Sequence, residues 1–250
     1  MASSCPSGVL VVSVAHHPLV LSSVRSFLRL GDAGSVRRCD PRTMGRSVAH
    51  ALGWWSLGGV LGLVLGGATS FGQQYLPEGL RPFANSNGGW TLLAVVVTVV
   101  CTRRGSARRW WIAAGMGLVV FHALLQGYSI VSTLRGFPSS YGPGDFSSVV
   151  ATLAGPVIGL AGFAWWSPSG VLRAAGAGVV AAVMIGDGAS GLLRVVETTG
   201  WLWWVLSIVL GVGMLVWVVL FRLDRMRDRA VAVALTATGA VALVLVFASL

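Results

Sequence analysis

The 250-residue sequence contains no lysine and little charge of either sign. Charged residues make up 10% of the chain and hydrophobic residues 55%, whereas soluble domains carry about 25% charged residues. A water-soluble fold cannot cover its surface with so few charges, but a protein whose outer faces contact lipid needs no more. The composition therefore predicts an integral membrane protein with the lipid bilayer as its main partner.

The sequence also lacks the patterns of metal sites and of enzymes. The cysteines Cys5, Cys39 and Cys101 have no CxxC spacing and no histidine pattern beside them, so neither a zinc site nor a redox pair is indicated. There is no HExxH sequence, no Gly-x-Ser-x-Gly turn, no phosphate-binding loop and no pair of intramembrane aspartates. We therefore expect no catalytic residue, no metal site and no cofactor.

Seven apolar segments are present, and most approach the ~20 residues that cross a hydrocarbon core. The second is short, because its 14 residues reach only about 21 Å as a helix, unless the span begins near Pro82. The sequence thus predicts an all-α polytopic transmembrane helix bundle of about seven spans. The expected helices cover residues 49–71, 88–101, 110–132, 146–166, 171–192, 201–221 and 230–250.

The 18 arginines are distributed unequally between these segments. Fifteen fall in the N-terminal region and in every second loop after it, and only Arg81, Arg135 and Arg194 fall in the other loops. Because positive residues near spans are retained on the cytoplasmic side, the pattern predicts a cytoplasmic N-terminus and requires the short second segment to cross. The arginines form no continuous basic surface, so we expect no nucleic-acid partner despite the net charge of +10.

Residues 1–46 differ from the transmembrane helical domain expected over residues 47–250. Their apolar stretch is broken by His16, His17 and Pro18, and no basic residue precedes it, so a signal peptide is not indicated. We expect a weakly ordered basic cytoplasmic tail that contacts anionic lipid. The alternative is that Met44 is the natural start and that residues 1–43 do not belong to the native protein. The lack of lysine beside abundant Ala, Gly and Val suggests a GC-rich bacterial genome, hence the bacterial cell (inner) membrane.

Two rows of small residues predict close helix packing. Gly58, Gly62 and Gly66 recur every four residues in the first apolar segment, and Gly155 and Gly159 repeat the spacing in the fourth. Such rows let two helices approach closely in lipid. Packing within one chain is the favoured interpretation, and the alternative is contact with a second copy or with a partner membrane protein.

The eleven tryptophans lie near the predicted helix ends, and none lies mid-span. Indole rings prefer the level of the lipid headgroups, so this distribution is typical of an aromatic belt. Four of them, Trp90, Trp201, Trp203 and Trp204, are expected at the outer ends of the spans.

One local combination of residues resembles a known family. A glycine-rich first helix leads to a Thr-x-x-x-Gln-x-x-Leu-Pro stretch, and an Asn-Ser pair follows shortly before a tryptophan. The combination resembles an uncharacterised family of small bacterial multi-pass membrane proteins, a domain of unknown function, mainly over residues 58–90. The resemblance implies the membrane architecture and no activity. Its residues here are Thr69, Gln73, Leu76, Pro77, Asn85, Ser86 and Trp90.

Polar residues within the predicted spans are the candidates for function. Asp187 is the only acid inside a span, and a charge in hydrocarbon costs about 2.5–3.5 kcal/mol on insertion scales, so such groups usually face a partner or a wet cavity. His122 and Gln126 are four residues apart and share a helix face. The candidates lie in the outer half of the predicted bundle, with His122 nearer its middle. They are Gln73, Asn85, His122, Gln126, Tyr128, Asp187, Arg194 and Glu197.

Two interpretations of these residues remain open. One is an outward-opening polar cavity in which Asp187 and His122 handle protons, as in a small permease or carrier for a polar solute. The other, slightly favoured by the sequence, is a set of interhelical hydrogen bonds with an Asp187–Arg194 ion pair. The corresponding alternative function is a structural or accessory membrane protein that packs against partner helices without transport or catalysis. No convincing internal repeat, which many transporters show, is present.

Overall fold

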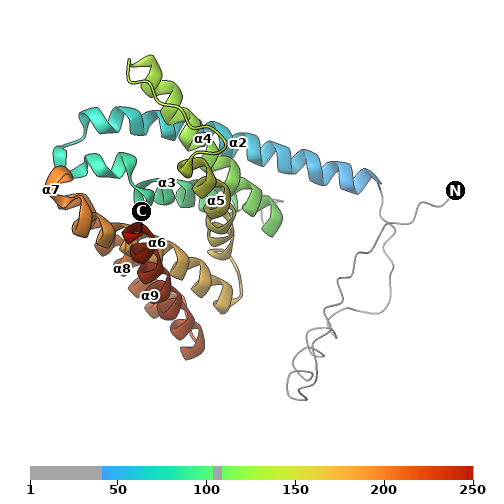
Figure 1. Cartoon of the computed structure of the whole chain (residues 1–250). Coiled ribbons are helices and arrows are strands. Elements are labelled where there is room, and N and C mark those ends of the chain that lie inside the picture. The colour runs from blue at the N-terminus through green and yellow to red at the C-terminus, as the bar shows by residue number, and fades with distance from the viewer. Residues whose placement is uncertain (1–40, 104–108, 250) are drawn as a thin grey trace, which may run out of the picture. The chain divides into compact units, whose positions relative to one another are not determined.

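The computed structural model describes residues 41–103 and 109–249, and within them the chain is helical and has no strand. Residues 1–40 of the predicted tail lie outside the described residues. The rest of the predicted tail, residues 41–46, belongs to the first described helix. The elements are α2 (Pro41–Tyr75), the 3-10 helix η1 (Glu78–Asn85), α3 (Asn87–Cys101), α4 (Trp110–Leu134), α5 (Phe146–Ala164), α6 (Gly170–Arg194), α7 (Val196–Thr199), α8 (Leu202–Phe221) and α9 (Met226–Ala248) (Figure 1).

Six helices are long and apolar enough to cross a membrane, namely α2 from Val48 onward, α4, α5, α6, α8 and α9. A seventh crossing results if η1 and α3, which meet at an angle of 62°, count as one broken span. The break lies at Ser86, so the second span does not extend back to Pro82 as one straight α-helix. The predicted all-α multi-pass bundle is confirmed.

Contacts with its neighbours establish the direction of α3. At its end, the Val99 carbonyl accepts a 2.8 Å hydrogen bond from the indole of Trp166, just beyond α5. At its start, the Gly88 N–H donates to Asp187 in the second half of α6. Helix α3 therefore runs parallel to α5 and antiparallel to α6. Although it has only 15 residues, it has the direction that the arginine distribution requires.

The arginines of the described residues separate into two groups at opposite ends of the helices. At one end, the Arg103 guanidinium lies 5.3 Å from the centre of the Trp166 ring, and Arg222 donates a 3.0 Å hydrogen bond to the Trp165 carbonyl. At the other, Arg135 hydrogen-bonds the hydroxyl of Ser70 at 2.8 Å. The arginine-rich end holds Arg103, Arg109, Arg173, Arg222, Arg225, Arg227 and Arg229, and the arginine-poor end holds Arg81, Arg135 and Arg194.

Cysteine labelling tests which end is cytoplasmic. Ser140 is exposed in the loop after α4 at the arginine-poor end, and Asp224 is exposed after α8 at the arginine-rich end. With the native cysteines replaced by serine, a membrane-impermeant maleimide should label Ser140→Cys in intact cells. It should label Asp224→Cys only after permeabilisation, because the arginine-rich end is retained inside. Labelling of both in intact cells would contradict the alternating order of the helices.

Both glycine rows pack against α4 within the chain. A Cβ atom at Gly62 of α2 would lie 2.8 Å from the Val120 carbonyl oxygen, and one at Gly155 of α5 would lie 2.8 Å from the Leu118 Cα. Gly58 and Gly66 of α2 and Gly159 of α5 meet the same helix. The rows therefore let α4 lie between α2 and α5 at backbone contact distance, the close approach expected of small residues in a membrane.

Candidate functional site

The start of α3 lies inside the protein, where backbone N–H groups need partners. Ser86 is the N-cap residue, and its buried hydroxyl oxygen accepts a 3.0 Å hydrogen bond from the Gly89 N–H. The same oxygen accepts a 2.9 Å hydrogen bond from the Trp203 indole of α8. A serine cap satisfies one of the free donors of a helix end, and here it also fastens α8 to the start of α3.

Asp187 of α6 supplies a second acceptor at the same helix end. One carboxylate oxygen accepts from the Gly88 N–H at 3.0 Å, and the other accepts from the Asn87 side-chain amide at 3.4 Å. The side chain is buried, with 4% of Asp187 exposed. A helix N-terminus favours a negative charge because its N–H groups point outward and its dipole is positive there. The start of α3 therefore provides the polar environment that this acid needs inside a span.

Glycine is required where α3 approaches this acid. A Cβ atom at Gly88 would lie 2.9 Å from the Asp187 carboxylate and 3.1 Å from the Ser207 hydroxyl. On α6, a Cβ at Gly188 would lie 2.7 Å from the carbonyl oxygen of Trp204. The absence of side chains at these positions lets α3, α6 and α8 converge around the carboxylate.

The predicted ion pair between Asp187 and Arg194 is wrong. Among the described residues no ion pair joins these two side chains, and Arg194 is exposed in the last turn of α6. The physical reason is that Asp187 points into the bundle toward α3, whereas Arg194 lies at the exposed end of the helix. The acid is satisfied by backbone and amide donors instead of by a cation.

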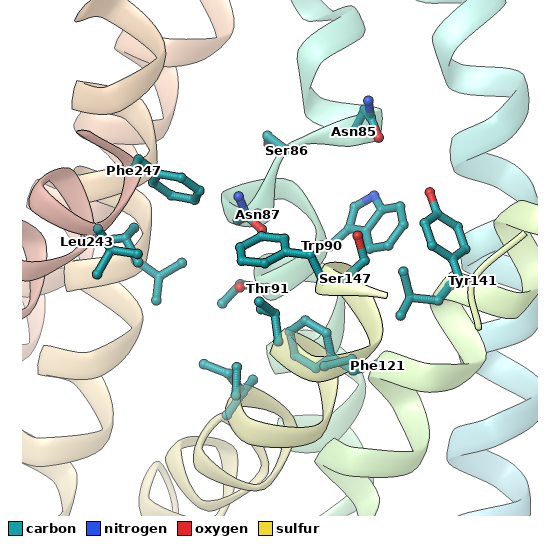
Figure 2. Close-up of a pocket in the computed structure, with 18 residues that line it drawn as sticks. Asn85, Ser86, Asn87, Trp90, Thr91, Phe121, Tyr141, Ser147, Leu243 and Phe247 are labelled. Carbon is teal, nitrogen blue, oxygen red and sulfur yellow. The ribbon is translucent and has the colours of Figure 1, made fainter. Parts of the chain in front are cut away.

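A cavity of about 220 Å³ opens beside the start of α3, between α4, α5, α6 and α9. Figure 2 shows Trp90 and Tyr141 on one side of it and Leu243 and Phe247 on the other. None of its lining residues carries a charge, and Asp187 is not among them. Its hydrogen-bonding groups come from Asn85, Ser86, Asn87, Thr91, Tyr141 and Ser147, and its apolar wall includes Phe121, Leu125, Ile158, Val183, Leu243 and Phe247.

Tyr141 adds a hydroxyl to this cavity from the loop between α4 and α5. Burial, and to a lesser degree the neighbouring Tyr128, raises the pKa of the Tyr141 phenol above its usual value. The phenol therefore stays protonated at neutral pH and can act as a hydrogen-bond donor.

A second, polar cavity of about 630 Å³ lies at the arginine-poor end, between the end of α2, η1 and α7. It brings together three of the predicted polar residues, Gln73, Asn85 and Glu197, with Glu78 and Arg81. Asn85 lines this cavity as well as the 220 Å³ cavity. Both cavities thus border the segment between η1 and α3.

Residues 46–250 match the model of a family described as a family of unknown function, DUF6518. The chain belongs to this family. The match extends over every span and both cavities, so the resemblance to an uncharacterised family over residues 58–90 is confirmed and extended to most of the DUF6518 chain. No curated protein and no solved structure matches it.

The other predicted polar residues of this DUF6518 protein connect α4 to its neighbours. The Tyr128 hydroxyl donates to Gln73 of α2 at 2.8 Å, and the Gln126 amide donates to the Tyr141 carbonyl at 3.3 Å. The His122 imidazole pairs with the Thr152 hydroxyl of α5 at 3.0 Å. The candidate residues therefore form several separate contacts, and His122, which lines neither cavity, is not brought together with Asp187.

Three residues that build the site of the DUF6518 chain were not predicted from its sequence. Asn87 and Gly88 bind the buried acid, and Trp203 binds the cap residue Ser86. Trp203 and Trp204 lie in the first turn of α8, the predicted outer end, but they are buried, with 3% and 7% exposed. Their indoles therefore donate to protein hydroxyls, those of Ser86 and Thr199. The signal in the sequence is Gly88-Gly89 in the first turn after the capping Ser86, because two glycines in a helix turn indicate close backbone approach.

No set of His, Cys, Asp and Glu side chains within residues 41–103 and 109–249 is arranged as a metal site. The lining of the 220 Å³ cavity offers hydrogen-bonding groups and apolar contacts, and the 630 Å³ cavity adds the charges of Glu78, Arg81 and Glu197.

Proposed function

We propose that this protein is a small carrier or binding protein of the bacterial inner membrane that takes an uncharged amphipathic solute from the outer side. The sequence predicted a polar solute, and we restrict this class to uncharged molecules that also have an apolar part. The observation that carries it is the cavity beside α3, where amide and hydroxyl groups meet an apolar wall and no charged residue lines the space.

The composition of the lining determines the chemical class of the solute. A charged group placed in a cavity without a counter-charge loses its hydration and is strongly disfavoured. An uncharged polar group satisfies Asn87 or Ser147, while a hydrocarbon part gains about 25 cal/mol per Å² of apolar surface that leaves water. The volume of about 220 Å³ is below the ~300 Å³ of typical ligand pockets, so the solute is small or inserts only one end.

The polar cavity at the arginine-poor end supports access from outside. It shares Asn85 with the apolar cavity, and its acids, Glu78 and Glu197, are accompanied by the cation Arg81. The arginine distribution predicts that this end faces outward. In this proposal the polar cavity accepts the head group from the outer side, and the hydrocarbon part occupies the apolar cavity beside α3.

A substitution that fills the cavity tests the proposal. Ala154 of α5 lines the cavity and is only partly buried, so Ala154→Phe should occupy the space without breaking the core. We expect this variant to bind radiolabelled 1-monooleoylglycerol, an uncharged amphipathic probe, at least about tenfold more weakly than the unmodified protein, a change of ~1.4 kcal/mol. The measurement is a scintillation proximity assay on protein purified in mild detergent.

The matched control is Val157→Phe on the same helix. Val157 is 46% exposed and lies outside the cavity lining, so the added ring faces lipid and binding should be unchanged. Equal binding by both variants, or no saturable binding by the unmodified protein, would exclude this cavity as the solute site. Such a result would favour the structural or accessory function, in which the helices hold a partner and transport nothing.

A further inference from the structure

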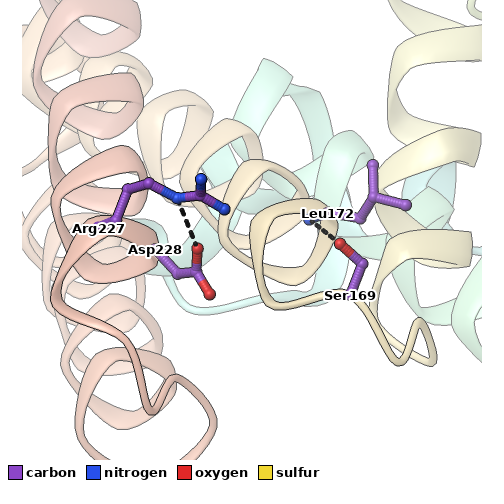
Figure 3. Close-up of polar contacts among 4 residues, drawn as sticks. All are labelled: Ser169, Leu172, Arg227 and Asp228. Carbon is purple, nitrogen blue, oxygen red and sulfur yellow. Dashed lines mark hydrogen bonds and ion pairs between the residues drawn. The ribbon is translucent and has the colours of Figure 1, made fainter. Parts of the chain in front are cut away.

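A third cavity, of about 370 Å³, lies at the arginine-rich end, where the loop before α6 meets the loop before α9. Ser169 and Gly170 form its wall at the start of α6, and Asp224, Arg225 and Asp228 form its wall beside α9. Figure 3 shows Asp228 reaching from the first turn of α9 toward Arg227, with the Ser169 cap of α6 nearby.

The charges around this cavity are mixed. Arg173, Arg225 and Arg227 bring three guanidinium groups, and Asp224 and Asp228 bring two carboxylates. Asp228 is 4% exposed, and a Cβ atom at Gly170 would touch its carboxylate. The one ion pair of Asp228, to Arg227, measures 3.6 Å, which is longer than a hydrogen bond. Positive and negative groups therefore line the same space.

Two buried atoms of the lining have no hydrogen-bond partner. They are the Nε donor of Arg173 and the Oδ1 acceptor of Asp228. A buried polar atom without a hydrogen-bond partner destabilises the folded protein, and more so when the group is charged. One of these atoms needs an acceptor and the other needs a donor, and both lie beside the same cavity. Together they indicate a ligand that carries both an acceptor and a donor.

The level of the cavity in the membrane indicates the source of that ligand. Arg173 also contacts a small adjoining pocket together with Trp165 and Arg222. The Trp165 and Trp217 rings stack there, with 5.7 Å between their centres. Indole rings prefer the headgroup region, so the cavity lies at the depth of lipid phosphates.

We propose that this cavity binds the headgroup of an aminophospholipid of the phosphatidylethanolamine type in the cytoplasmic leaflet. The lipid phosphate accepts hydrogen bonds from Arg173 and Arg225, and the ammonium group donates to Asp228. Charge-assisted bonds of this kind are stronger than neutral ones, which favours an ammonium over a hydroxyl as the donor to the buried carboxylate. The site is independent of the proposed solute cavity, because it lies at the opposite end of the helices.

Native mass spectrometry of the full chain in detergent tests the headgroup. Phosphatidylethanolamine, phosphatidylcholine and phosphatidylglycerol with identical acyl chains are added at equal concentration. We expect phosphatidylethanolamine to bind at least about tenfold more tightly than phosphatidylcholine, whose quaternary ammonium has no N–H donor. Equal binding of these two lipids, or tighter binding of phosphatidylglycerol, would overturn the proposal. Displacement of the lipid by soluble phosphoethanolamine at equal concentration would overturn the membrane as its source.

Two variants assign the binding to this cavity. Asp228→Asn should lower phosphatidylethanolamine binding to the level of phosphatidylcholine, and Arg173→Gln should weaken the binding of both lipids. Arg194→Gln, at the arginine-poor end, is the matched control and should change neither. An unchanged lipid preference in Asp228→Asn would overturn the assignment. If that variant does not fold, the headgroup comparison on the unmodified chain and Arg173→Gln still decide it.

Discussion

Gly66→Ala is expected to destabilise the protein by about 3 kcal/mol, the upper range for overpacking a close contact. A Cβ atom at Gly66 would overlap the Leu124 carbonyl oxygen and lie 2.8 Å from the Leu124 Cα. These are backbone atoms of α4, and they cannot turn aside as a flexible side chain can. The substitution therefore forces α2 and α4 apart along their whole contact. Unfolding in mild detergent by SDS titration measures the loss.

Gly53→Ala is the matched control on the same helix. A Cβ atom at Gly53 meets nothing within 4 Å, so the methyl group enters open space. Alanine favours a helix over glycine by about 1 kcal/mol, so this variant should be as stable as the unmodified protein or slightly more so. Equal destabilisation by both substitutions would show that the helix backbone, and not its contact with α4, limits stability.

The fold follows from the sequence to the extent that the bilayer imposes it. The lengths of the apolar segments and the positions of the arginines are read directly along the sequence. These two features predicted the spans and their alternating direction. They also predicted the direction of α3, whose 15 residues run parallel to α5. The glycine spacing at Gly62 and Gly155 predicted close packing, but not that both rows meet α4, because the choice of partner depends on the whole bundle.

The candidate site was less predictable, because the main partner of the Asp187 carboxylate is a backbone N–H group and not a side chain. Asp187 stands out as an acid within a span, and the nearest cation in the sequence suggested Arg194 as its partner. The actual donors are the Gly88 N–H, 99 residues away, and the Asn87 amide. The partial charge of a helix N-terminus comes from backbone geometry, which composition and spacing do not display.

The same geometry predicts different outcomes for two changes at Asp187. Asp187→Ala removes both acceptors and leaves the Gly88 N–H and the Asn87 amide buried without their partner. Each unsatisfied group costs about 1–3 kcal/mol, so a loss of about 3 kcal/mol in unfolding free energy is expected. Asp187→Asn keeps one oxygen to accept from Gly88, and should lose only about 1 kcal/mol. SDS titration of both variants measures the difference, with the exposed acid Glu197→Ala as control.

Binding of 1-monooleoylglycerol by the same variants separates a structural role of Asp187 from a direct role in solute binding. Asp187 does not line the apolar cavity, so folded Asp187→Asn should retain the affinity of the unmodified protein. A carrier that neutralises a cationic solute at Asp187 would show the opposite pattern, with nearly normal stability and lost binding or transport. That result would place Asp187 in the solute site. An acid that only accepts hydrogen bonds from the start of α3 can be replaced by a neutral acceptor of the same shape, so its loss would not abolish binding.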